Sequence, residues 1–346
     1  MDSVTHLVAG ALTPLAFRHM PRRGLVVAFG ILAGELPDID VLVGGTASAE
    51  ALFTVHRGIT HALVYQPVLA LALVLPMYLF MSARDSRHVP RLGAMFAAAL
   101  LGLYIHLYLD CMTTFGTQVF LPFSAYRVAL PAMFIVDLLC TLPAMALLLV
   151  ALASPPEPGP TGPEYGARTR RYARLGLCWL LIYPLLSLGA NGLVYLREHA
   201  GLASGETLRV ITEPFTPFVW KRIVDDGSRL RISTDYLWRP SSEEPETVYA
   251  KALLLPELAA RHPLFAQFAT FAGPAVQVER PAEADGSRQV DFIGERYLFS
   301  PQSPARFFGR SDPNFVMQVR LSPAGDPSAF RFKNRGRDAG PWTPVE

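Results

Sequence analysis

LGAMFAAALLGLYIHLYLD, residues 92–110, decides the fold class of this chain. From Leu92 to Leu109 the stretch is almost entirely apolar, and a helix that crosses a membrane needs about 20 such residues, with about 17 as the lower limit. Its end carries His106 and Asp110, which are four residues apart and therefore share one helix face. The stretch predicts a membrane helix that is closed by a polar pair.

Other stretches of the first 200 residues are also apolar. With 51% hydrophobic and only 17% charged residues, the chain is too apolar for an ordinary soluble protein. Two weaker segments are each also consistent with a re-entrant or interfacial helix: Val4 to His19 and Leu25 to Val43. Three further stretches are long enough to cross a membrane: Leu63 to Met81, Ala132 to Ala153, and Tyr172 to Tyr195.

Basic residues between these stretches predict their orientation, because Lys and Arg near span ends remain cytoplasmic. Two of the alternate connections, 44–61 and 110–131, hold only Arg57 and Arg127. The pattern predicts six crossings, with the first residue and everything after about residue 197 on the external side. The remaining connections hold clusters of arginine: Arg18, Arg22 and Arg23; Arg84, Arg87 and Arg91; and Arg168, Arg170, Arg171 and Arg174.

The predicted fold class is an α-helical membrane protein of about six transmembrane helices with a C-terminal soluble α+β domain. Residues 1–153 form the transmembrane domain, 154–171 a cytoplasmic Pro/Gly-rich linker, 172–196 the final transmembrane helix, and 197–346 the extracytoplasmic domain. Ser154 to Pro163 (SPPEPGPTGP) is expected to be a flexible loop, because proline lacks a backbone donor and glycine costs entropy in regular structure.

Beyond residue 197, short alternating runs with turn signals predict strands. Trp220 to Val224 and Leu230 to Leu237 flank Asp226-Gly227 and predict a hairpin. Gln289 to Phe299 and Phe315 to Leu321 predict further strands, whereas Pro256 to Ala272 has helical spacing.

The remaining composition excludes several classes of protein. Cys111, Cys140 and Cys178 all lie in or beside apolar stretches, which excludes a disulfide scaffold and a CxxC zinc module. No basic face interleaved with aromatic residues appears, so nucleic acid is not an expected partner. The expected surroundings are the lipid bilayer, and the net charge of +2 says nothing about a protein partner, which stays unknown.

Four separate segments bring histidine and aspartate to one face of the predicted membrane. Charged groups near hydrocarbon cost several kcal/mol unless they are paired or bound to metal. Imidazole and carboxylate together suit Zn²⁺, with Mn²⁺ or Fe as alternatives. The candidate ligands exceed what one tetrahedral ion needs, so one or two ions are expected. They are Asp2 and His6, Asp38 and Asp40, His56 and His61, and His106 and Asp110.

Each of these motifs alone has a plainer explanation. His106 and Asp110 are consistent with a packed pair on one helix, and Asp38 and Asp40 after a proline with a turn or cap. Asp2 is consistent with a first-turn helix acid. The joint occurrence of all four segments favours a metal site. A further acid, Asp137, lies within the fifth stretch, and we expect a histidine or arginine partner for it.

In order along the chain, these motifs resemble a bacterial family of membrane-bound proteins described as metal-dependent hydrolases, which includes a LexA-binding inner-membrane-associated type. The resemblance covers residues 1–150 closely and extends loosely through Pro214 to Arg222. It implies a bacterial inner-membrane location and a His/Asp metal centre. The motifs are MDxxTHxxxG (Met1 to Gly10), LPDID (Leu36 to Asp40), HRGxTH (His56 to His61) and HxxxDxxTTFGTQxxxPFS (His106 to Ser124).

The predicted activity is hydrolysis of an ester or phosphodiester bond in a lipid-derived substrate by metal-activated water, whose pKa a metal lowers toward about 7. Asp38 or Asp40 would act as base or bridging ligand. Arg57 would hold an anionic group such as phosphate, or is a helix-start charge at the lipid headgroups. Thr113, Thr114 and Gln118 would orient ligands, or simply satisfy loop backbone.

Two alternatives remain open from the residues. Intramembrane acids and histidines also line the paths of metal or proton transporters, although these ligands cluster at one face. A non-catalytic membrane protein could use the same metal only to tie its helices together.

Overall fold

The computed structural model describes residues 1–18, 24–43, 55–85, 89–159, 162–239, 245–283, 285–309, 313, 315–334 and 340–345. The described residues form two compact units, which divide between Gly189 and Ala190. Three arginines used to predict orientation, Arg22, Arg23 and Arg87, lie outside the described residues.

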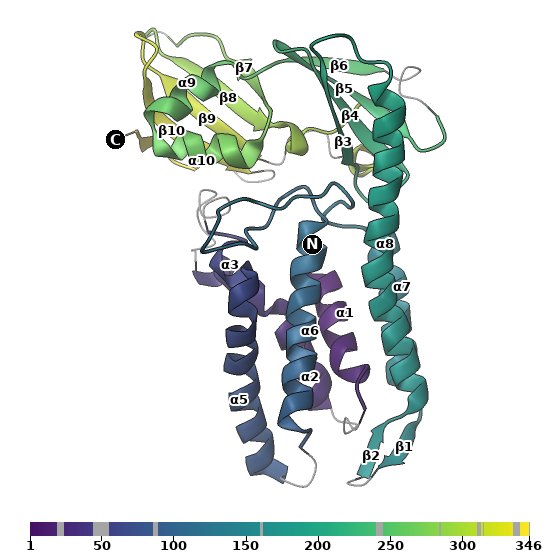
Figure 1. Cartoon of the computed structure of the whole chain (residues 1–346). Coiled ribbons are helices and arrows are strands. Elements are labelled where there is room, and N and C mark those ends of the chain that lie inside the picture. Colours follow the sequence, from purple (N-terminus) through teal and green to yellow (C-terminus); the bar gives the residue numbers. More distant parts are fainter. Residues whose placement is uncertain are drawn as a thin grey trace. The chain divides into compact units, whose positions relative to one another are not determined.

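The first unit is helical (Figure 1). In order, its main helices are α1 (Ser3–Leu15), α2 (Gly24–Glu35), α5 (Gln66–Asp85), α6 (Leu92–Cys111), α7 (Leu138–Ala153) and α8 (Ala167–His199), whose last turns belong to the second unit. Short helical segments connect them: η1 (Leu36–Ile39), α3 (Asp40–Val43), η2 (Ile59–His61) and η3 (Leu63–Tyr65).

Among the described residues, three helices are long and apolar enough to cross a membrane: Leu63–Arg84, Leu92–Cys111 and Ala167–His199. The prediction of six crossings is not confirmed. With 13 residues, α1 rises only about 20 Å, whereas the hydrocarbon layer is about 30 Å thick. The described part of the second stretch breaks at Pro37, and α7 begins at Leu138 instead of Ala132.

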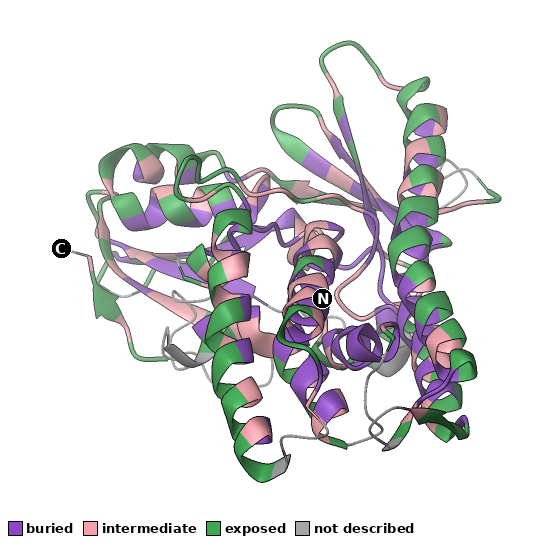
Figure 2. Ribbon diagram, turned by 60° about the horizontal axis from the view of Figure 1, so that its bottom comes forward, coloured by how far each residue is buried: buried purple, intermediate pink, exposed green. Residues whose placement is uncertain are grey.

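The long helices present apolar side chains on their outer sides. Val68 and Leu75 on α5 are exposed, as are Leu185 and Leu186 on α8. Figure 2 shows that exposed residues follow the length of the long helices. Such apolar faces are unfavourable in water and suit contact with lipid.

Helices α1 and α2 touch through their backbones at glycine positions. A Cβ atom at Gly10 would lie 2.3 Å from the carbonyl oxygen of Gly30, and one at Gly34 would lie 2.6 Å from that of His6. Small residues allow this close approach between membrane helices. The contact holds the first turn of α1 beside the end of α2.

The segment from Ser154 to Pro163 was expected to be a flexible loop, and this expectation was wrong. Part of the segment is ordered, because β1 (Pro156–Gly159) pairs antiparallel with β2 (Gly162–Tyr165). A two-stranded ribbon has only edge strands, where proline is tolerated.

The partner of Asp137 is also different from the one expected. Its carboxylate caps the start of α7 and accepts hydrogen bonds of 2.8 Å from the Tyr183 hydroxyl group, so a phenol takes the place of the predicted histidine or arginine.

The second unit contains two antiparallel sheets. One has the order β3 (Thr207–Thr212), β4 (Val219–Asp225), β5 (Arg229–Tyr236), β6 (Glu246–Ala250). The other has the order β11 (Thr343–Pro344), β10 (Pro327–Asn334), β9 (Phe315–Leu321), β8 (Arg288–Gly294), β7 (Ala275–Glu279). The predicted hairpin is confirmed as β4 and β5.

Two helices of this unit pack against its hydrophobic core. The expected helix is divided at His262, where Pro263 follows, into α9 (Leu254–Arg261) and α10 (Pro263–Ala272). Fully buried Phe268 and Phe271 of α10 pack on Phe315 of β9. The helix spacing of apolar residues therefore reflects burial against a sheet.

We expect Gly30→Val to destabilise the helical unit by about 1–3 kcal/mol, because the new side chain overlaps the α1 backbone. Thermal unfolding in detergent should show a lower midpoint. Gly93→Val on α6 is the matched control, because a Cβ at Gly93 meets nothing within 4 Å. Equal midpoints for the two variants would contradict the glycine contact.

Candidate metal centre

The predicted site residues lie at corresponding ends of their helices. His6 is near the start of α1, and His106 and Asp110 are near the end of α6. Pro37 follows the end of α2, where residues before proline leave the helical conformation, and the chain turns into η1, which carries Asp38. His61 ends η2, just before the helix that begins the third stretch.

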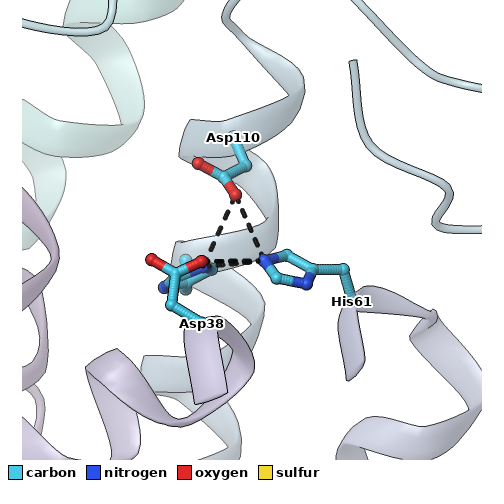
Figure 3. A group of neighbouring side chains, drawn as sticks. Asp38, His61 and Asp110 are labelled. Carbon is cyan, nitrogen blue, oxygen red and sulfur yellow. Dashed lines mark hydrogen bonds and ion pairs between the residues drawn. The ribbon is translucent and has the colours of Figure 1, made fainter. Parts of the chain in front are cut away.

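Four side chains bring one donor atom each to a common point (Figure 3). His61 Nε2 lies 3.2 Å from His106 Nε2, 3.3 Å from Asp38 Oδ1 and 3.4 Å from Asp110 Oδ2. His106 Nε2 lies 3.6 Å from Asp38 Oδ1 and 3.5 Å from Asp110 Oδ2. Metal to ligand distances of about 2.0–2.1 Å in a tetrahedron imply donor spacings of about 3.3–3.4 Å. The observed spacing fits one small cation.

Hydrogen bonds on the far side of each imidazole ring place its proton away from the centre. His106 Nδ1 lies 2.6 Å from the carbonyl oxygen of Gly34, which can only accept. His61 Nδ1 lies 3.1 Å from Thr60 Oγ1 and 3.3 Å from Asp40 Oδ2. Because the Thr60 hydroxyl donates to Asp40, its oxygen accepts from His61. Both Nε2 atoms are thus left with lone pairs.

The two carboxylate oxygens at this point also lack donors. Among the described residues, neither Asp38 Oδ1 nor Asp110 Oδ2 has a hydrogen-bond partner, although both atoms are buried. Four lone-pair donors facing one another without a proton between them repel, and a buried polar group without a partner costs free energy. The donor set therefore fits a divalent cation.

A second, more open group adjoins the first. Asp38, Asp40 and His56 each bring a ligand atom within 4.8 Å of the others. The His56 side chain is 15% exposed and that of Asp38 is 21% exposed, whereas His61 and Asp110 are 0% exposed. Asp38 belongs to both groups, so its carboxylate links them.

Arg57 takes a different position from the anion-binding one expected from the sequence. Its side chain is buried, with Nη2 2.8 Å from Asp110 Oδ1 and Nη1 donating to Thr113 Oγ1 at 3.0 Å. Its backbone, at a positive φ of 60°, donates to Asp40 Oδ2. Arg57 thus offsets one carboxylate charge and holds Asp110 with its other oxygen toward the centre.

The first pair of candidate ligands is not part of the four-donor group, although His6 contacts two of its residues. Asp2 caps α1 and accepts hydrogen bonds from the backbone and hydroxyl group of Thr5. His6 stacks on His106, with ring centroids 3.7 Å apart, and its Nε2 lies 3.2 Å from Asp110 Oδ1. Neither residue belongs to the two ligand groups of the described chain.

Two supporting groups were missed by reasoning from the sequence. Thr60 lies inside the HRGxTH motif, so the motif contained the signal but not the role of its hydroxyl group. The Gly34 carbonyl carries no sequence signal, because its position depends on how α2 packs. Thr113 was expected to orient ligands, and it contacts both Arg57 and the Asp110 carbonyl.

We expect the purified chain to retain divalent metal, and His61→Ala and His106→Ala to reduce it to background, because each removes one of four donors. Elemental analysis after dialysis measures this. Asp2→Asn, which preserves the helix cap, and His199→Gln on α8 are controls that should keep wild-type content. Metal-free wild-type protein that binds none of Zn²⁺, Mn²⁺ or Fe²⁺ would show that the cluster is an imidazolium and carboxylate network instead.

Comparison with known proteins covers the helical unit. The uncharacterized protein YfhP of Bacillus subtilis (strain 168) is 31% identical over 140 residues, which is 38% of this chain and 40% of that protein. The chain thus spans well under half of the length of this relative, and no solved structure matches. A family model described as YdjM inner membrane protein matches residues 1–194 and does not extend to Pro214 to Arg222, where the looser resemblance stays untested. Because that match covers more than half of the chain and every candidate ligand, the protein belongs to the YdjM family of inner membrane proteins.

Proposed function

We propose that this protein is a membrane-bound, metal-dependent hydrolase that cleaves an ester or phosphodiester bond in a lipid-derived substrate. The observation that carries the proposal is the convergence of four lone-pair donors, from Asp38, His61, His106 and Asp110, at tetrahedral spacing. A cation bound there supplies a Lewis acid that polarises a substrate oxygen and lowers the pKa of water.

The contacts divide the acids into different roles. Asp40 is fully engaged, since Oδ1 contacts His56 and Oδ2 accepts from the Arg57 backbone and the Thr60 hydroxyl group. Asp38 is the most exposed of the four donors and belongs to both ligand groups. We therefore assign Asp38 as the carboxylate that would act as a ligand or receive a proton, and Asp40 as a residue that positions His56 and His61.

Apolar side chains beside the centre favour a substrate that arrives from lipid. Val55, Ile59 and Val64 are all exposed, and they flank His56 and His61 along the chain. On the elements that carry the other donors, Ile39 of η1 and Tyr104 of α6 are also exposed. A hydrophobic rim around a polar centre suits a substrate with an acyl chain and a polar ester or phosphate.

A second function is favoured by one observation. Four protein donors around a single ion are typical of a structural site, whereas catalytic zinc usually keeps one position open. A metal that only ties η1, η2 and α6 together would have such a closed set of four protein donors. The more exposed second group, with His56, distinguishes the two functions, because a purely structural ion has no use for it.

We expect His56→Ala to abolish turnover in a screen of phospholipid and phosphodiester substrates while keeping one tightly bound ion and a near wild-type unfolding midpoint. His56 belongs only to the second, more open group of Asp38, Asp40 and His56. His61→Ala should lose activity, metal and thermal stability together. Activity assays, metal content and thermal unfolding are measured on the same samples.

We expect Asp40→Asn to bind metal less tightly than His56→Ala and more tightly than His61→Ala. Loss of a carboxylate that orients a ligand histidine should weaken metal binding about 10–100-fold. If wild-type protein with full metal content hydrolyses none of the screened lipids, and His56→Ala differs from it in no measurement, the structural function stands.

A further inference from the structure

We propose that the helical unit binds one anionic phospholipid at the end opposite the metal centre. The site is a cavity of about 700 Å³ between the end of α1, the first part of α6 and the first half of α8. Its apolar wall includes Phe17, Leu101, Ile105 and Leu181, and its lining includes Arg18, Arg91 and Arg174. This inference stands on residues outside the metal centre and does not depend on the proposed hydrolase activity.

The cationic part of the cavity is larger than these three side chains. An adjoining hollow of about 380 Å³ shares Arg18 and Arg174 and adds Arg170 and Arg171. Arg174 Nε donates to the carbonyl oxygen of Ala16, which fixes the guanidinium group between α8 and the end of α1. Guanidinium groups bind phosphate oxygens through paired hydrogen bonds.

Acidic groups balance only part of this charge. Glu157 lies 3.8 Å from Arg170, which also donates to the Tyr165 carbonyl. Among the described residues, Glu157 is the acid paired with these five arginines, which leaves positive charge beside an apolar wall. A phosphate on an acyl chain complements both parts, whereas a zwitterionic headgroup would bring a second cation to the cluster.

The length of the cavity suits an acyl chain. Arg91 precedes α6, and Ile105 in the cavity wall lies fourteen residues further along. At 1.5 Å per residue the cavity wall extends about 21 Å along the helix from Arg91, which is more than half of a hydrocarbon layer of about 30 Å. The arginines would then lie at headgroup depth, with an acyl chain along Leu101, Ile105 and Leu181.

The arginine end of the cavity is separate from the metal centre, whereas its apolar wall extends along α6 as far as Ile105, which precedes His106. His106 follows Arg91 by fifteen residues on the same helix, which corresponds to about 22 Å along the axis. A lipid phosphate among the arginines therefore could not reach the donor cluster. The bound lipid would stabilise the packing of α1, α6 and α8.

Native mass spectrometry and thermal unfolding of the full chain in detergent test the proposal, with phosphatidylglycerol or phosphatidylcholine of identical acyl chains as the probe. We expect one phosphatidylglycerol to remain bound and to raise the unfolding midpoint, and phosphatidylcholine to bind at least tenfold more weakly. Soluble glycerol phosphate tests whether the acyl chain is needed, and it should have no effect at the same concentration.

Variants separate charge from shape. Arg91→Gln and Arg174→Gln should each weaken phosphatidylglycerol binding about fivefold, since a basic residue near the membrane surface contributes about 1 kcal/mol. Ala94→Trp should block the cavity without changing its charge. Arg84→Gln, on α5 and outside the cavity lining, is the charge-matched control and should bind as wild type.

Three outcomes would overturn the proposal. Equal binding of the two lipids by wild-type protein would remove the charge argument, and this measurement needs no variant. Equal weakening by Arg84→Gln and Arg91→Gln would indicate general attraction to the surface. An effect of glycerol phosphate equal to that of the lipid would indicate an anion site without a lipid.

Discussion

Repulsion among four buried lone pairs is the constraint on which the helical unit depends. His61 and His106 turn their Nε2 atoms toward each other at 3.2 Å, and one oxygen each of Asp38 and Asp110 completes the set. With both rings neutral and protonated on Nδ1, such an arrangement is stable only if a cation lies between the four donors. The η1 and η2 segments and the end of α6 are therefore tied to the ion that occupies that point.

The surrounding contacts orient these donors before anything binds. The backbone contact of α1 with α2 fixes the end of α2, whose Gly34 carbonyl accepts from His106. Asp40 and Thr60 orient His61, and Arg57 holds Asp110. Fixed outer contacts select the ring nitrogen that binds and reduce the entropy lost on binding. Because Arg57 makes these contacts with Asp110 and Thr113, its side chain is buried and not exposed to a substrate.

Polar chemistry is divided between the two ends of the helices. Carboxylates and imidazoles gather where α6 ends, and arginines gather where it begins. An apolar helix can hold either set only at its ends or in a satisfied cluster, because an isolated charge within hydrocarbon costs several kcal/mol. The two ends of α6 therefore differ in the type of polar side chain that they hold.

By itself the sequence determined the apolar helices and the eight His and Asp residues in four motifs, because composition and four-residue spacing are local properties. It also determined the β4 and β5 hairpin through a local turn signal. The sequence did not determine where α7 begins. The apolar run starts at Ala132, whereas the helix starts at Leu138, after its cap Asp137. Only the tertiary structure decided that Asp2 caps a helix while Asp38 joins His61, His106 and Asp110, since donor distances depend on how distant segments pack.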